Sequence, residues 1–527
     1  MFTWNEAVGP LRREVIFSDR VVWRFPDRPT SLFQMLRDAV AARGDCEALV
    51  CGENRFTWAE VDAAAAAVAG GLAARGIGPG DRVALLAGND SPFVITALAA
   101  ARLGAVVVPV SIRERKAELN YVLAHCGAKA ILYDADLASE IPDPADVPNL
   151  TVKILAGGED WRALLASAPA PAAEVGPEDT AVILYTSGTT GRPKGALIAN
   201  ANLVHSTMAF VKAMKLGSED RMVVTVPLSH VTGLVALMTV SVLAQGTLIV
   251  VPAFKAADFL RLAAQERMTH TVLVPAMYNL CLLQPDVAEH DLSAWRIAGY
   301  GGAPMPLGTI EKAAQLWPKA GLMNLYGATE TTSPATMLPS QFARSHLDTV
   351  GLPSAGAEIT IMDDNGVETP RGEIGEIWIK GPMVVKGYLN NPDATASEFV
   401  AGYWKSGDLG TMDADGFVRV LDRKKDMINR GGYKIFSAEV ESLLMEHPSV
   451  AEAAIIGKPC PVLGERVHAV ICLREGVIGD EASLSAFVAE RAADYKRPET
   501  WRLSHDPLPR NANGKVRKKL LREALEG

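Results

Sequence analysis

A short segment rich in glycines, hydroxyl groups and cations runs from Tyr185 to Gly195, with the sequence YTSGTTGRPKG. Glycines let backbone N–H groups approach an anion closely, serine and threonine hydroxyls donate hydrogen bonds, and Lys194 adds a positive charge. The apolar run Thr180 to Leu184 predicts a buried strand before this segment, and a helical pattern is expected after it. We predict a loop that binds nucleotide phosphates through these residues: Thr186, Ser187, Gly188, Thr189, Thr190, Gly191 and Lys194.

The spacing of this segment excludes a Walker A loop, because Lys194 is followed by Gly195 instead of serine or threonine. The remaining alternative is an ordinary solvated turn, since short glycine motifs also occur where nothing binds. The segment alone indicates a nucleotide phosphate and does not identify the reaction.

Four further motifs follow in order along the chain: Asn324 to Glu330 (NLYGATE), Tyr403 to Gly410 (YWKSGDLG), Asp422 to Asp426 (DRKKD) and Pro509 to Lys515 (PRNANGK). Together with the phosphate loop, and over nearly the whole chain, they resemble the adenylate-forming superfamily. That superfamily contains acyl-CoA synthetases, the adenylation domains of peptide synthetases, and luciferases. Five linked motifs in one order are a far more specific signal than any one of them.

The resemblance implies a ligase that activates a carboxylic acid in two steps. The acid first attacks the α-phosphate of ATP and gives acyl-AMP and pyrophosphate, and the thiol of coenzyme A then displaces AMP. Catalysis of the first step consists mainly of positioning the reactants and neutralising negative charge on oxygens. ATP, Mg²⁺ and coenzyme A are the expected cofactors and co-substrates.

The resemblance also assigns catalytic roles to four residues. Lys515, in an exposed loop, is expected to place its ammonium between the carboxylate and the α-phosphate. Glu330 is expected to bind Mg²⁺, which suits one carboxylate together with phosphates and waters. Thr189 and His230 complete the set. Without the resemblance, Lys515 could be a solvated surface lysine, and Glu330 a carboxylate favoured at a helix N-terminus.

The nucleoside part of ATP has its own expected contacts. Asp408 would accept hydrogen bonds from the ribose hydroxyls and Arg423 would donate to the same sugar, although a local salt bridge explains each equally well alone. Two glycine-bearing segments would frame the adenine, which needs close backbone approach; a tight turn is the alternative for the first. Their residues are Gly301, Gly302, Ala303, Pro304, Asn324, Tyr326, Gly327, Ala328 and Thr329.

For the second step the resemblance implies a small C-terminal domain that swings about a hinge at Lys425. The segment Arg430 to Glu441 matches the part that shapes a tunnel for the thiol, with Gly431 and Gly432 as its lining. Lys434 is expected to contact phosphate or coenzyme A. The alternative for Gly432 is a glycine required by a hairpin or a bulge.

The acyl pocket is expected near His230, in the motif PLSHVTG, where the resemblance makes the ring a gate between the carboxylate and the thiol. A core histidine is the alternative. Relatives that activate amino acids place an aspartate near this position, whereas Val231 to Gly233 follow here, so an amino acid substrate is disfavoured. The predicted lining is apolar and favours an aromatic or medium-length aliphatic acid. It comprises His230, Leu234, Met238, Met277, Tyr278, Ala298 and Tyr300.

The elements that position these residues follow an alternating pattern, which indicates an α/β fold with parallel sheets. Residues 58–75 and 92–103 read as helices, and residues 82–87 and 105–110 as strands. We expect α/β subdomains at about 1–170 and 171–350, a small β-barrel-like subdomain at 351–422, and a mobile α+β C-terminal domain at 423–527. The first three form an adenylation domain over 1–422.

Composition limits the function classes. The chain has 527 residues, 49% of them hydrophobic and 21% charged, and a net charge of −9, so no global basic field exists to hold nucleic acid. Six cysteines without a CxxC pair and a start without an apolar signal region favour a reduced, cytoplasmic protein. The nearly uncharged stretch Val231 to Phe254 is divided by Gln245 and Gly246, so a buried helix and strand are expected there and no integral membrane association.

Three alternatives to the coenzyme A ligase stay open. An acyl-AMP ligase would pass its acyl group to a carrier protein, although no carrier domain follows Gly527. A luciferase-like oxygenase shares the first step. A non-catalytic acyl-adenylate-binding module would not require Lys515, Glu330, Asp408 and Arg423 together. The expected partners are a small carboxylic acid, ATP and coenzyme A, and a homodimer is left open.

Overall fold

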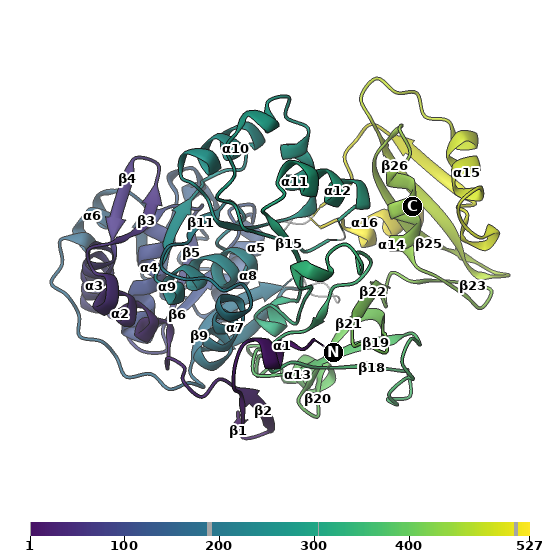
Figure 1. The fold of residues 1–527 in the computed structure, drawn as a ribbon. Helices are drawn as coiled ribbons and strands as arrows, with labels where there is room; N and C mark the ends of the chain where they lie inside the picture. Colours follow the sequence, from purple (N-terminus) through teal and green to yellow (C-terminus); the bar gives the residue numbers. More distant parts are fainter. Residues whose placement is uncertain (1, 187–191, 304, 511–514, 527) are drawn as a thin grey trace. The chain divides into compact units, whose positions relative to one another are not determined.

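The computed structural model describes residues 2–186, 192–303, 305–510 and 515–526 (Figure 1). The chain forms two compact units. The first comprises Met1–Ile359 with Ile379–Trp404, and the second comprises Thr360–Trp378 with Lys405–Gly527. The expected division into domains at residues 422 and 423 remains a prediction.

One six-stranded sheet of the first unit has the order β10-β9-β6-β5-β7-β8. All of its neighbouring strands are parallel except β9 and β10, which are antiparallel. Its strands are β5 (Arg82–Leu86), β6 (Val106–Pro109), β7 (Ala130–Tyr133), β8 (Val152–Leu155), β9 (Thr180–Thr186) and β10 (Lys194–Ala199).

The other large sheet has nine strands in the order β17-β16-β15-β14-β13-β11-β12-β3-β4. Its central strands are parallel, and antiparallel strands flank them at both edges. The strands are β3 (Glu47–Cys51), β4 (Asn54–Thr57), β11 (Arg221–Val224), β12 (Thr247–Val250), β13 (His270–Leu273), β14 (Ile297–Gly301), β15 (Gly321–Tyr326), β16 (Thr336–Met337) and β17 (Leu352–Pro353).

The two sheets exchange strands along the sequence. β3 and β4, from the first 60 residues, join the nine-stranded sheet, whereas β9 and β10 join the six-stranded sheet formed by earlier strands. A boundary near residue 170 therefore does not separate one sheet from the other. Crossover helices make this possible, because a parallel strand can be added at any edge once a helix spans the sheet.

Helices of the first unit pack on these sheets, as α3 does on β3 and β4 and α4 does on β6, while α2 packs on α3 and α4 (Figure 1). They are α1 (Trp4–Ala7), α2 (Leu32–Arg43), α3 (Trp58–Ala74), α4 (Ser91–Leu103), α5 (Lys116–Cys126), α6 (Glu159–Leu165), α7 (Asn200–Ala213), α8 (Val231–Gly233), α9 (Val240–Ala244), α10 (Ala256–Gln265), α11 (Pro275–Leu282), α12 (Leu307–Leu316) and α13 (Pro392–Glu398). Short 3₁₀ helices are η1 (Ala135–Glu140), η3 (Val287–Glu289), η4 (Thr329–Thr331) and η5 (Ser340–Phe342).

Local signals explain where the predicted helices begin and end. The Thr57 hydroxyl accepts from the Glu60 N–H at 3.2 Å, and the Glu60 carboxylate accepts from the Thr57 N–H at 2.7 Å, which caps α3. Gly104 ends α4 in the left-handed region with φ of 65°. The four elements predicted between residues 58 and 110 are present with ends shifted by no more than a residue or two. The α/β fold class is confirmed.

The remaining strands lie in three smaller sheets. β1 (Arg12–Ile16) and β2 (Arg20–Arg24) form a hairpin of the first unit. Residues 358–423 form a five-stranded sheet of β18 (Glu358–Met362), β19 (Gly375–Lys380), β20 (Phe399–Val400), β21 (Tyr403–Met412) and β22 (Val418–Arg423). The third sheet is built from β23 (Ile428–Arg430), β24 (Tyr433–Ile435), β25 (Val450–Cys460), β26 (Gly464–Leu473) and β27 (Thr500–Ser504).

Helices of the second unit complete an α+β arrangement at the C-terminal end of the chain, as expected from the sequence. They are α14 (Ser437–Met445), α15 (Glu481–Ala489), η6 (Asp494–Lys496) and α16 (Lys518–Glu526). Ile428, Val440, Ile455 and Leu484 lie in its buried core, which the third small sheet shares with α14 and α15.

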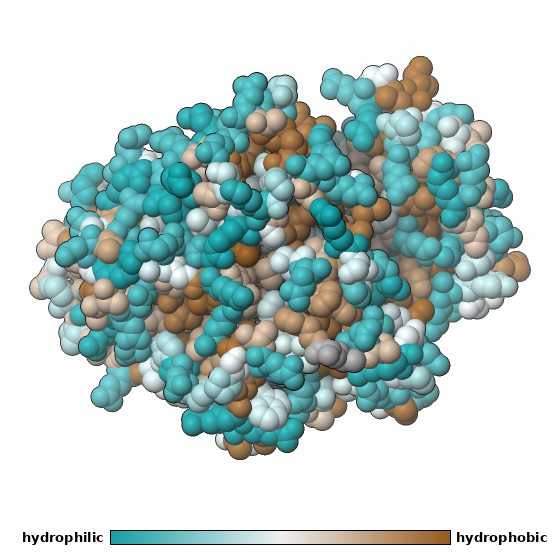
Figure 2. Space-filling view, viewed as in Figure 1, coloured by the Kyte–Doolittle hydropathy of each residue, from teal (hydrophilic) through white to brown (hydrophobic). Residues whose placement is uncertain are grey.

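The apolar stretch tested for a membrane span is divided as predicted. α8, the π-helix η2 (Leu234–Thr239) and α9 run on from one another, Gln245 adopts the left-handed conformation, and β12 follows. No helix within the described residues is both long and apolar enough to cross a bilayer. Figure 2 shows hydrophobic residues among hydrophilic ones on the visible face, with a hydrophobic area around α11, where Leu280 and Leu283 are 49% and 72% exposed.

Candidate active site

The two described ends of the phosphate-loop segment belong to neighbouring strands. β9 and β10 are antiparallel, and their register pairs Thr186 with Lys194 and Tyr185 with Gly195. The expectation that a helix directly follows the loop is wrong, because β10 comes first and α7 begins only at Asn200. The stretch Lys194 to Ala199 is short and mostly buried. Periodicity does not distinguish so short an apolar stretch from the start of the helix that follows it.

Five of the predicted phosphate contacts lie outside the described residues. They are Ser187, Gly188, Thr189, Thr190 and Gly191. The two ends of the segment are described, and the Thr186 hydroxyl lies 3.5 Å from the Lys194 carbonyl oxygen. The phosphate-binding and catalytic roles of these residues therefore stay predictions.

Lys194 is buried in this structure, with 8% of its side chain exposed. Its Nζ forms an ion pair with Oε1 of Glu398 and lies 4.4 Å from the centre of the Tyr388 ring. A buried ammonium requires a charged or hydrogen-bonded partner, and Glu398 supplies one. The positive charge that the sequence indicated is therefore held at a defined place in the structure.

Glu330 lies in the 3₁₀ helix η4, directly after β15, and is 7% exposed. Its Oε1 accepts hydrogen bonds from the Thr186 hydroxyl at 3.3 Å and from the Tyr388 hydroxyl at 2.9 Å. The Val385 N–H donates to the Glu330 carbonyl at 2.9 Å, which fixes the backbone as well. The phosphate-loop motif and the NLYGATE motif, 144 positions apart, thus meet at one carboxylate.

The surroundings of Glu330 fit the kind of Mg²⁺ site that the sequence predicts. Mg²⁺ in ATP-dependent enzymes is bound by one or two carboxylates together with substrate phosphates and waters. Glu330 is such a carboxylate, and no cluster of three or more histidine, cysteine, aspartate or glutamate side chains suited to a metal occurs within the described part of the chain. Glu330 would hold the cation from the protein side.

The predicted adenine segments follow the carboxyl ends of two adjacent parallel strands. Gly301 ends β14 and pairs with Leu325 of β15, and a Cβ at Gly301 would lie 2.3 Å from the Leu325 carbonyl oxygen. Gly302 follows with φ of 79°, a conformation that favours glycine. The segments Gly301 to Ala303 and Tyr326 to Thr329 therefore begin side by side. Crevices beyond the carboxyl ends of parallel strands are the usual ligand sites of such sheets.

Asn324, a member of this group, has a hydrogen-bond partner within the protein. The Asn324 amide donates to the Thr349 carbonyl at 3.0 Å, which ties β15 to the loop before β17. Pro304 lies outside the described residues. Nucleotide binding by the group stays a prediction.

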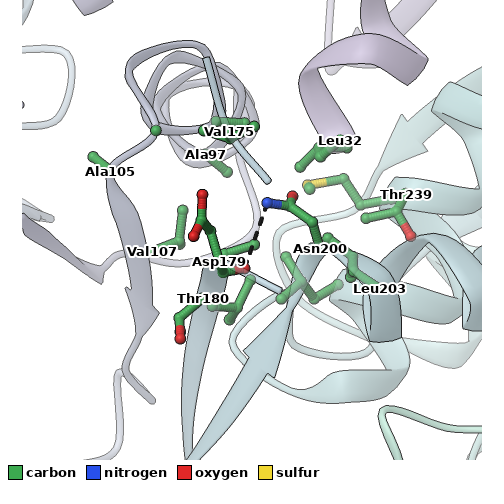
Figure 3. Close-up of a pocket in the computed structure, with 16 residues that line it drawn as sticks. Leu32, Ala97, Ala105, Val107, Val175, Asp179, Thr180, Asn200, Leu203 and Thr239 are labelled. Atoms are coloured by element: carbon green, nitrogen blue, oxygen red, sulfur yellow. Dashed lines mark hydrogen bonds between the residues drawn. The ribbon is translucent and has the colours of Figure 1, made fainter. Parts of the chain in front are cut away.

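The predicted acyl-pocket residues fall into two groups. Leu234 and Met238 lie on η2 and line a cavity of about 30 Å³ (Figure 3). Asp179 and Asn200 face the same cavity, with the Asn200 amide 3.5 Å from the Asp179 carbonyl. Such a volume holds about one water molecule, so this cavity by itself does not accommodate an aromatic or medium-length acid.

The second group lies in the hydrophobic core beside the nine-stranded sheet. Tyr278, Ala298 and Tyr300 are fully buried there, and Met277 packs against them. The Tyr278 hydroxyl donates to the Gly299 carbonyl at 2.9 Å. Burial raises the pKa of Tyr300 to about 12 and also raises the pKa of Tyr278, so both rings stay neutral.

His230 stands at the N-terminal cap of α8 and is half-buried. Its Nδ1 accepts a hydrogen bond from the Thr232 N–H at 3.3 Å and lies 3.2 Å from the Thr232 hydroxyl. An acceptor Nδ1 carries no proton, so the neutral ring carries its proton on Nε2. The geometry favours a ring that donates or blocks over one that abstracts a proton at Nδ1. The following π-helix is of a kind that often occurs at functional sites.

In the second unit, the two predicted ribose contacts face each other. Asp408 of β21 and Arg423 of β22 are cross-strand partners, and Arg423 Nε lies 2.7 Å from Asp408 Oδ1. Asp408 is 5% exposed, and the Arg423 side chain is 41% exposed. The local salt bridge that was the alternative interpretation is therefore present. It does not exclude ribose binding, because each carboxylate oxygen can accept more than one hydrogen bond.

The substitution Asp408→Asn tests the ribose assignment. Asparagine keeps the shape and removes the charge, so a loss of about 10- to 100-fold in affinity for ATP is expected, in line with the roughly 1.5–3 kcal/mol of a hydrogen bond to a charged group. Steady-state kinetics should show a raised KM for ATP with an unchanged KM for the acid. Asp413→Asn is the control, since Asp413 only caps the turn of the same hairpin through Phe417 N–H at 2.9 Å. Equal increases in both KM values would contradict the assignment.

The predicted thiol-tunnel glycines form the turn of a two-residue hairpin. β23 and β24 pair Arg430 with Tyr433, and Gly431 and Gly432 between them have φ of 58° and 94°. Positive φ at both turn positions is typical of a type I′ turn, which strongly favours glycine. A Cβ at Gly432 would meet no heavy atom within 4 Å, so this unit itself leaves open space there. The hairpin explains the glycines, and a tunnel role stays a prediction.

Two predicted lysines flank this hairpin in the sequence: Lys425 precedes β23 and Lys434 lies on β24. Partial desolvation lowers the pKa of Lys425, which lies between β22 and β23 and is exposed. Lys434 is exposed on β24. The hinge role of the first and the phosphate or coenzyme A contact of the second stay predictions.

Lys515 follows a stretch that lies outside the described residues, 511–514. It is exposed, and the backbones of Arg510 and Val516 pair antiparallel around the stretch. α16 begins three residues later with Lys518, whose Nζ lies 2.6 Å from Glu441 Oε1 and donates to the Ser437 hydroxyl at 2.6 Å. The Lys515 loop is thus fixed at its C-terminal side to α14.

Sequence analysis missed two residues of the first unit that contact the predicted site, Tyr388 and Glu398. They lie in the segment GYLNNPDATASEF, which has a start signal for a short helix in Asn391 and Pro392. That signal could have placed α13. Nothing local indicates that Glu398 meets Lys194, which lies 204 positions earlier.

The buried carboxylate of Glu330 beside Thr186 and the glycine segments at parallel strand ends are consistent with the class of AMP-binding enzymes, and comparison with known families shows that class. The family model of the AMP-binding enzyme matches residues 36–389, and that of the AMP-binding enzyme C-terminal domain matches residues 439–515. The chain belongs to this family and, within it, is an AMP-forming acyl-CoA synthetase, a carboxylic acid:CoA ligase. The resemblance and the enzyme class predicted from the sequence are confirmed.

Individual relatives support this classification over nearly the whole chain. A feruloyl-CoA synthase of Amycolatopsis is 35% identical over 467 residues, which cover 89% of this chain and 93% of the relative. A long-chain-fatty-acid–CoA ligase of Mycobacterium tuberculosis is 34% identical, with the same two coverages. The structure of o-succinylbenzoate coenzyme A synthetase from Bacillus subtilis with ATP and magnesium ion has a TM-score of 0.84 and 30% identity, covering 94% of this chain and 99% of that one.

Proposed function

We propose that this ligase couples a hydrophobic aromatic or medium-length aliphatic carboxylic acid to coenzyme A in two steps. In the first, a carboxylate oxygen bonds to the α-phosphorus of ATP and pyrophosphate leaves. In the second, the coenzyme A sulfur bonds to the acyl carbon, AMP leaves and the thiol proton passes to solvent. The single observation that carries the proposal is Glu330, buried and hydrogen-bonded to Thr186 at the phosphate hairpin.

The residues act mainly by holding charge in place. Glu330 binds Mg²⁺, which neutralises phosphate oxygens when bound. The segment 186–194 supplies N–H groups and hydroxyls to the phosphates, and Lys515 places its ammonium where negative charge develops between the carboxylate and the α-phosphate. Asp408 and Arg423 hold the ribose, and the strand ends at Gly301 and Tyr326 hold the base.

An apolar substrate is supported by the residues around the expected acyl site. Leu234, Met238 and Met277 are hydrophobic, and the rings of Tyr278 and Tyr300 are neutral at physiological pH. None of them carries a charge that could form an ion pair with a second carboxylate or with an α-ammonium group. Two relatives have the names feruloyl-CoA synthase and long-chain-fatty-acid–CoA ligase, which supports a carboxylic acid substrate of the aromatic or aliphatic class.

A screen of carboxylic acids tests the proposal. Purified protein with ATP and Mg²⁺ is offered aromatic, medium-chain, long-chain and dicarboxylic acids, with and without coenzyme A, and AMP release is measured. We expect fast AMP release only with coenzyme A and only for apolar acids. Acid-dependent exchange of labelled pyrophosphate into ATP should occur without coenzyme A.

The same screen separates the alternatives. AMP release that needs an acyl carrier protein instead of coenzyme A would identify the acyl-AMP ligase. Selective turnover of a dicarboxylic or amino acid would contradict the proposed substrate class. Absence of pyrophosphate exchange across the whole panel would contradict the proposed first step.

A further inference from the structure

Glu398 occupies a position that the stability of its own helix does not explain. It is the last residue of the seven-residue helix α13, and a carboxylate at a helix C-terminus is disfavoured by the helix dipole. Its side chain is 29% exposed and forms the ion pair with Lys194, which is far more buried. The position of Glu398 is therefore explained by its ion pair with Lys194 on β10 and not by the stability of α13.

Tyr388 links this ion pair to the predicted magnesium ligand. Its hydroxyl lies 2.6 Å from Glu398 Oε2 and 2.9 Å from Glu330 Oε1, and it is 4% exposed. The Thr395 hydroxyl accepts from the Tyr388 N–H at 3.0 Å, and the Phe399 ring packs on it with centroids 5.4 Å apart. Tyr388 therefore has a fixed place between the two carboxylates, with its ring face against the Lys194 ammonium.

We propose that Glu398 and Tyr388 are positioning residues for ATP: Glu398 holds the Lys194 ammonium, and Tyr388 holds Glu398 and Glu330 in a fixed relation to it. The proposal deepens the proposed function and rests on it, since it assumes that Lys194 and Glu330 serve the triphosphate. Both residues act through others and do not themselves touch the reacting atoms.

The physical basis is the flexibility of lysine. Its ammonium sits on a four-carbon stem with many rotamers, and it has three N–H donors. Glu398 uses part of that donor capacity and fixes the stem, which leaves N–H groups for a phosphate oxygen. A preorganised charge stabilises an anion better than one that must first be ordered.

The charge count of the group also suits a metal–triphosphate ligand. Glu330 and Glu398 contribute two negative charges and Lys194 one positive charge, so the group carries one net negative charge. The Tyr388 hydroxyl is a polar donor and adds no formal charge to this count. A divalent cation bound at Glu330 makes the group positive, which matches the negative triphosphate.

The same unit contains a chemically matched group away from the phosphate hairpin. Lys380 Nζ lies 3.5 Å from Glu358 Oε2 and 5.5 Å from the Tyr403 ring centre, and the Tyr403 hydroxyl lies 3.5 Å from the same carboxylate oxygen. Glu358→Gln therefore removes a glutamate from an equivalent lysine–tyrosine setting without touching the predicted site. It is the control for Glu398→Gln.

The first experiment compares Glu398→Gln, Glu398→Asp and Glu358→Gln by kinetics and by calorimetric titration of ATP with Mg²⁺ in the absence of acid. We expect Glu398→Gln to raise both the KM and the Kd for ATP about tenfold, with the KM for the acid and the kcat within about threefold of wild type. Glu398→Asp should recover most of the affinity, and Glu358→Gln should leave it unchanged. A lower KM for ATP in Glu398→Gln would overturn the proposal, because Glu398 would then compete with the phosphates for Lys194.

A second experiment tests whether Glu398 acts through Lys194. If it does, Lys194→Met with Glu398→Gln should have the same Kd for ATP as Lys194→Met alone, since no ammonium is left to position. If the losses of ATP affinity in the two single variants add up in the double variant, Glu398 does not act through Lys194. A lowered melting temperature with unchanged ATP affinity would show that the Glu398–Lys194 ion pair is only a structural contact. Absence of pyrophosphate exchange by the wild type would refute the proposed function instead, and the calorimetric Kd values would still decide the role of Glu398.

Discussion

Lys515→Ala is expected to slow acyl-AMP formation by about 10³-fold while leaving the transfer of the acyl group from supplied acyl-AMP to coenzyme A within about threefold of wild type. The first step moves negative charge onto oxygens between the carboxylate and the α-phosphate, and removal of one well-placed donor at such a position costs about 10²–10³-fold. In the second step the leaving group is AMP and the nucleophile is a thiol, so the same ammonium is not required there.

Two separate assays check this expectation: pyrophosphate exchange for the first step, and acyl-CoA formation from chemically prepared acyl-AMP for the second. Lys519→Ala is the matched control, because Lys519 is an exposed lysine four positions later whose only described ion pair is with Glu523 on the same helix. The control should behave as wild type in both assays. Equal losses in both half-reactions of Lys515→Ala would show that the loop serves the fold or the second step and not the first.

The elements that the sequence predicted best are those with strong local signals. α3 has a capping box at Thr57 and Glu60, and α4 ends at Gly104 in the left-handed region, so both helices were placed within a residue or so. The strand between them, β5, and the strand after α4, β6, are short and mostly buried. Periodicity and end signals are local properties, and they suffice for such elements.

The sequence pattern did not predict which strands pair with one another. The segment after the phosphate loop resembles the start of α7, yet Lys194–Ala199 pairs antiparallel with β9. β3 and β4 join a sheet whose other strands begin only at Arg221. Neither propensity nor periodicity encodes the choice of partner strand, whether the partner is the neighbouring segment, as for β10, or lies far along the chain, as β12 does for β3.

The candidate site divides in the same way. Motifs identified Lys194, Glu330, Asp408 and Arg423 because each stands in a recognisable run of residues. Motifs did not show that Lys194 is buried against Glu398, and Glu398 lies in an ordinary stretch at the end of a short helix. The supporting residues of a site are chosen by geometry, so they carry weaker sequence signals than the residues they support.

Gly432→Leu should show the reverse pattern of Lys515→Ala, with acyl-AMP formation within about threefold of wild type and thioester formation from acyl-AMP reduced by 10²-fold or more. The side chain would project into space that the second unit leaves open, since no heavy atom lies within 4 Å of the added Cβ. If that space is the path of the pantetheine arm, leucine blocks it without disturbing the packing of its own unit. The near-attack geometry of a thiol is sensitive to displacements of about 1 Å, which cost about 10²-fold.

Backbone strain is the competing cause for such a loss, because Gly432 has φ of 94° and a left-handed conformation costs a residue with a side chain roughly 1–2 kcal/mol. Gly476→Leu controls for it: Gly476 has φ of 75°, and an added Cβ there also meets nothing within 4 Å. Both variants should lose similar thermal stability, and only Gly432→Leu should lose the second half-reaction. Normal thioester formation in Gly432→Leu would show that Gly432 does not line the tunnel. An equal loss in Gly476→Leu would lead to the same conclusion, because backbone strain is common to both variants whereas the tunnel contact is expected only at Gly432. In either case Gly432 would be a glycine that only the turn requires.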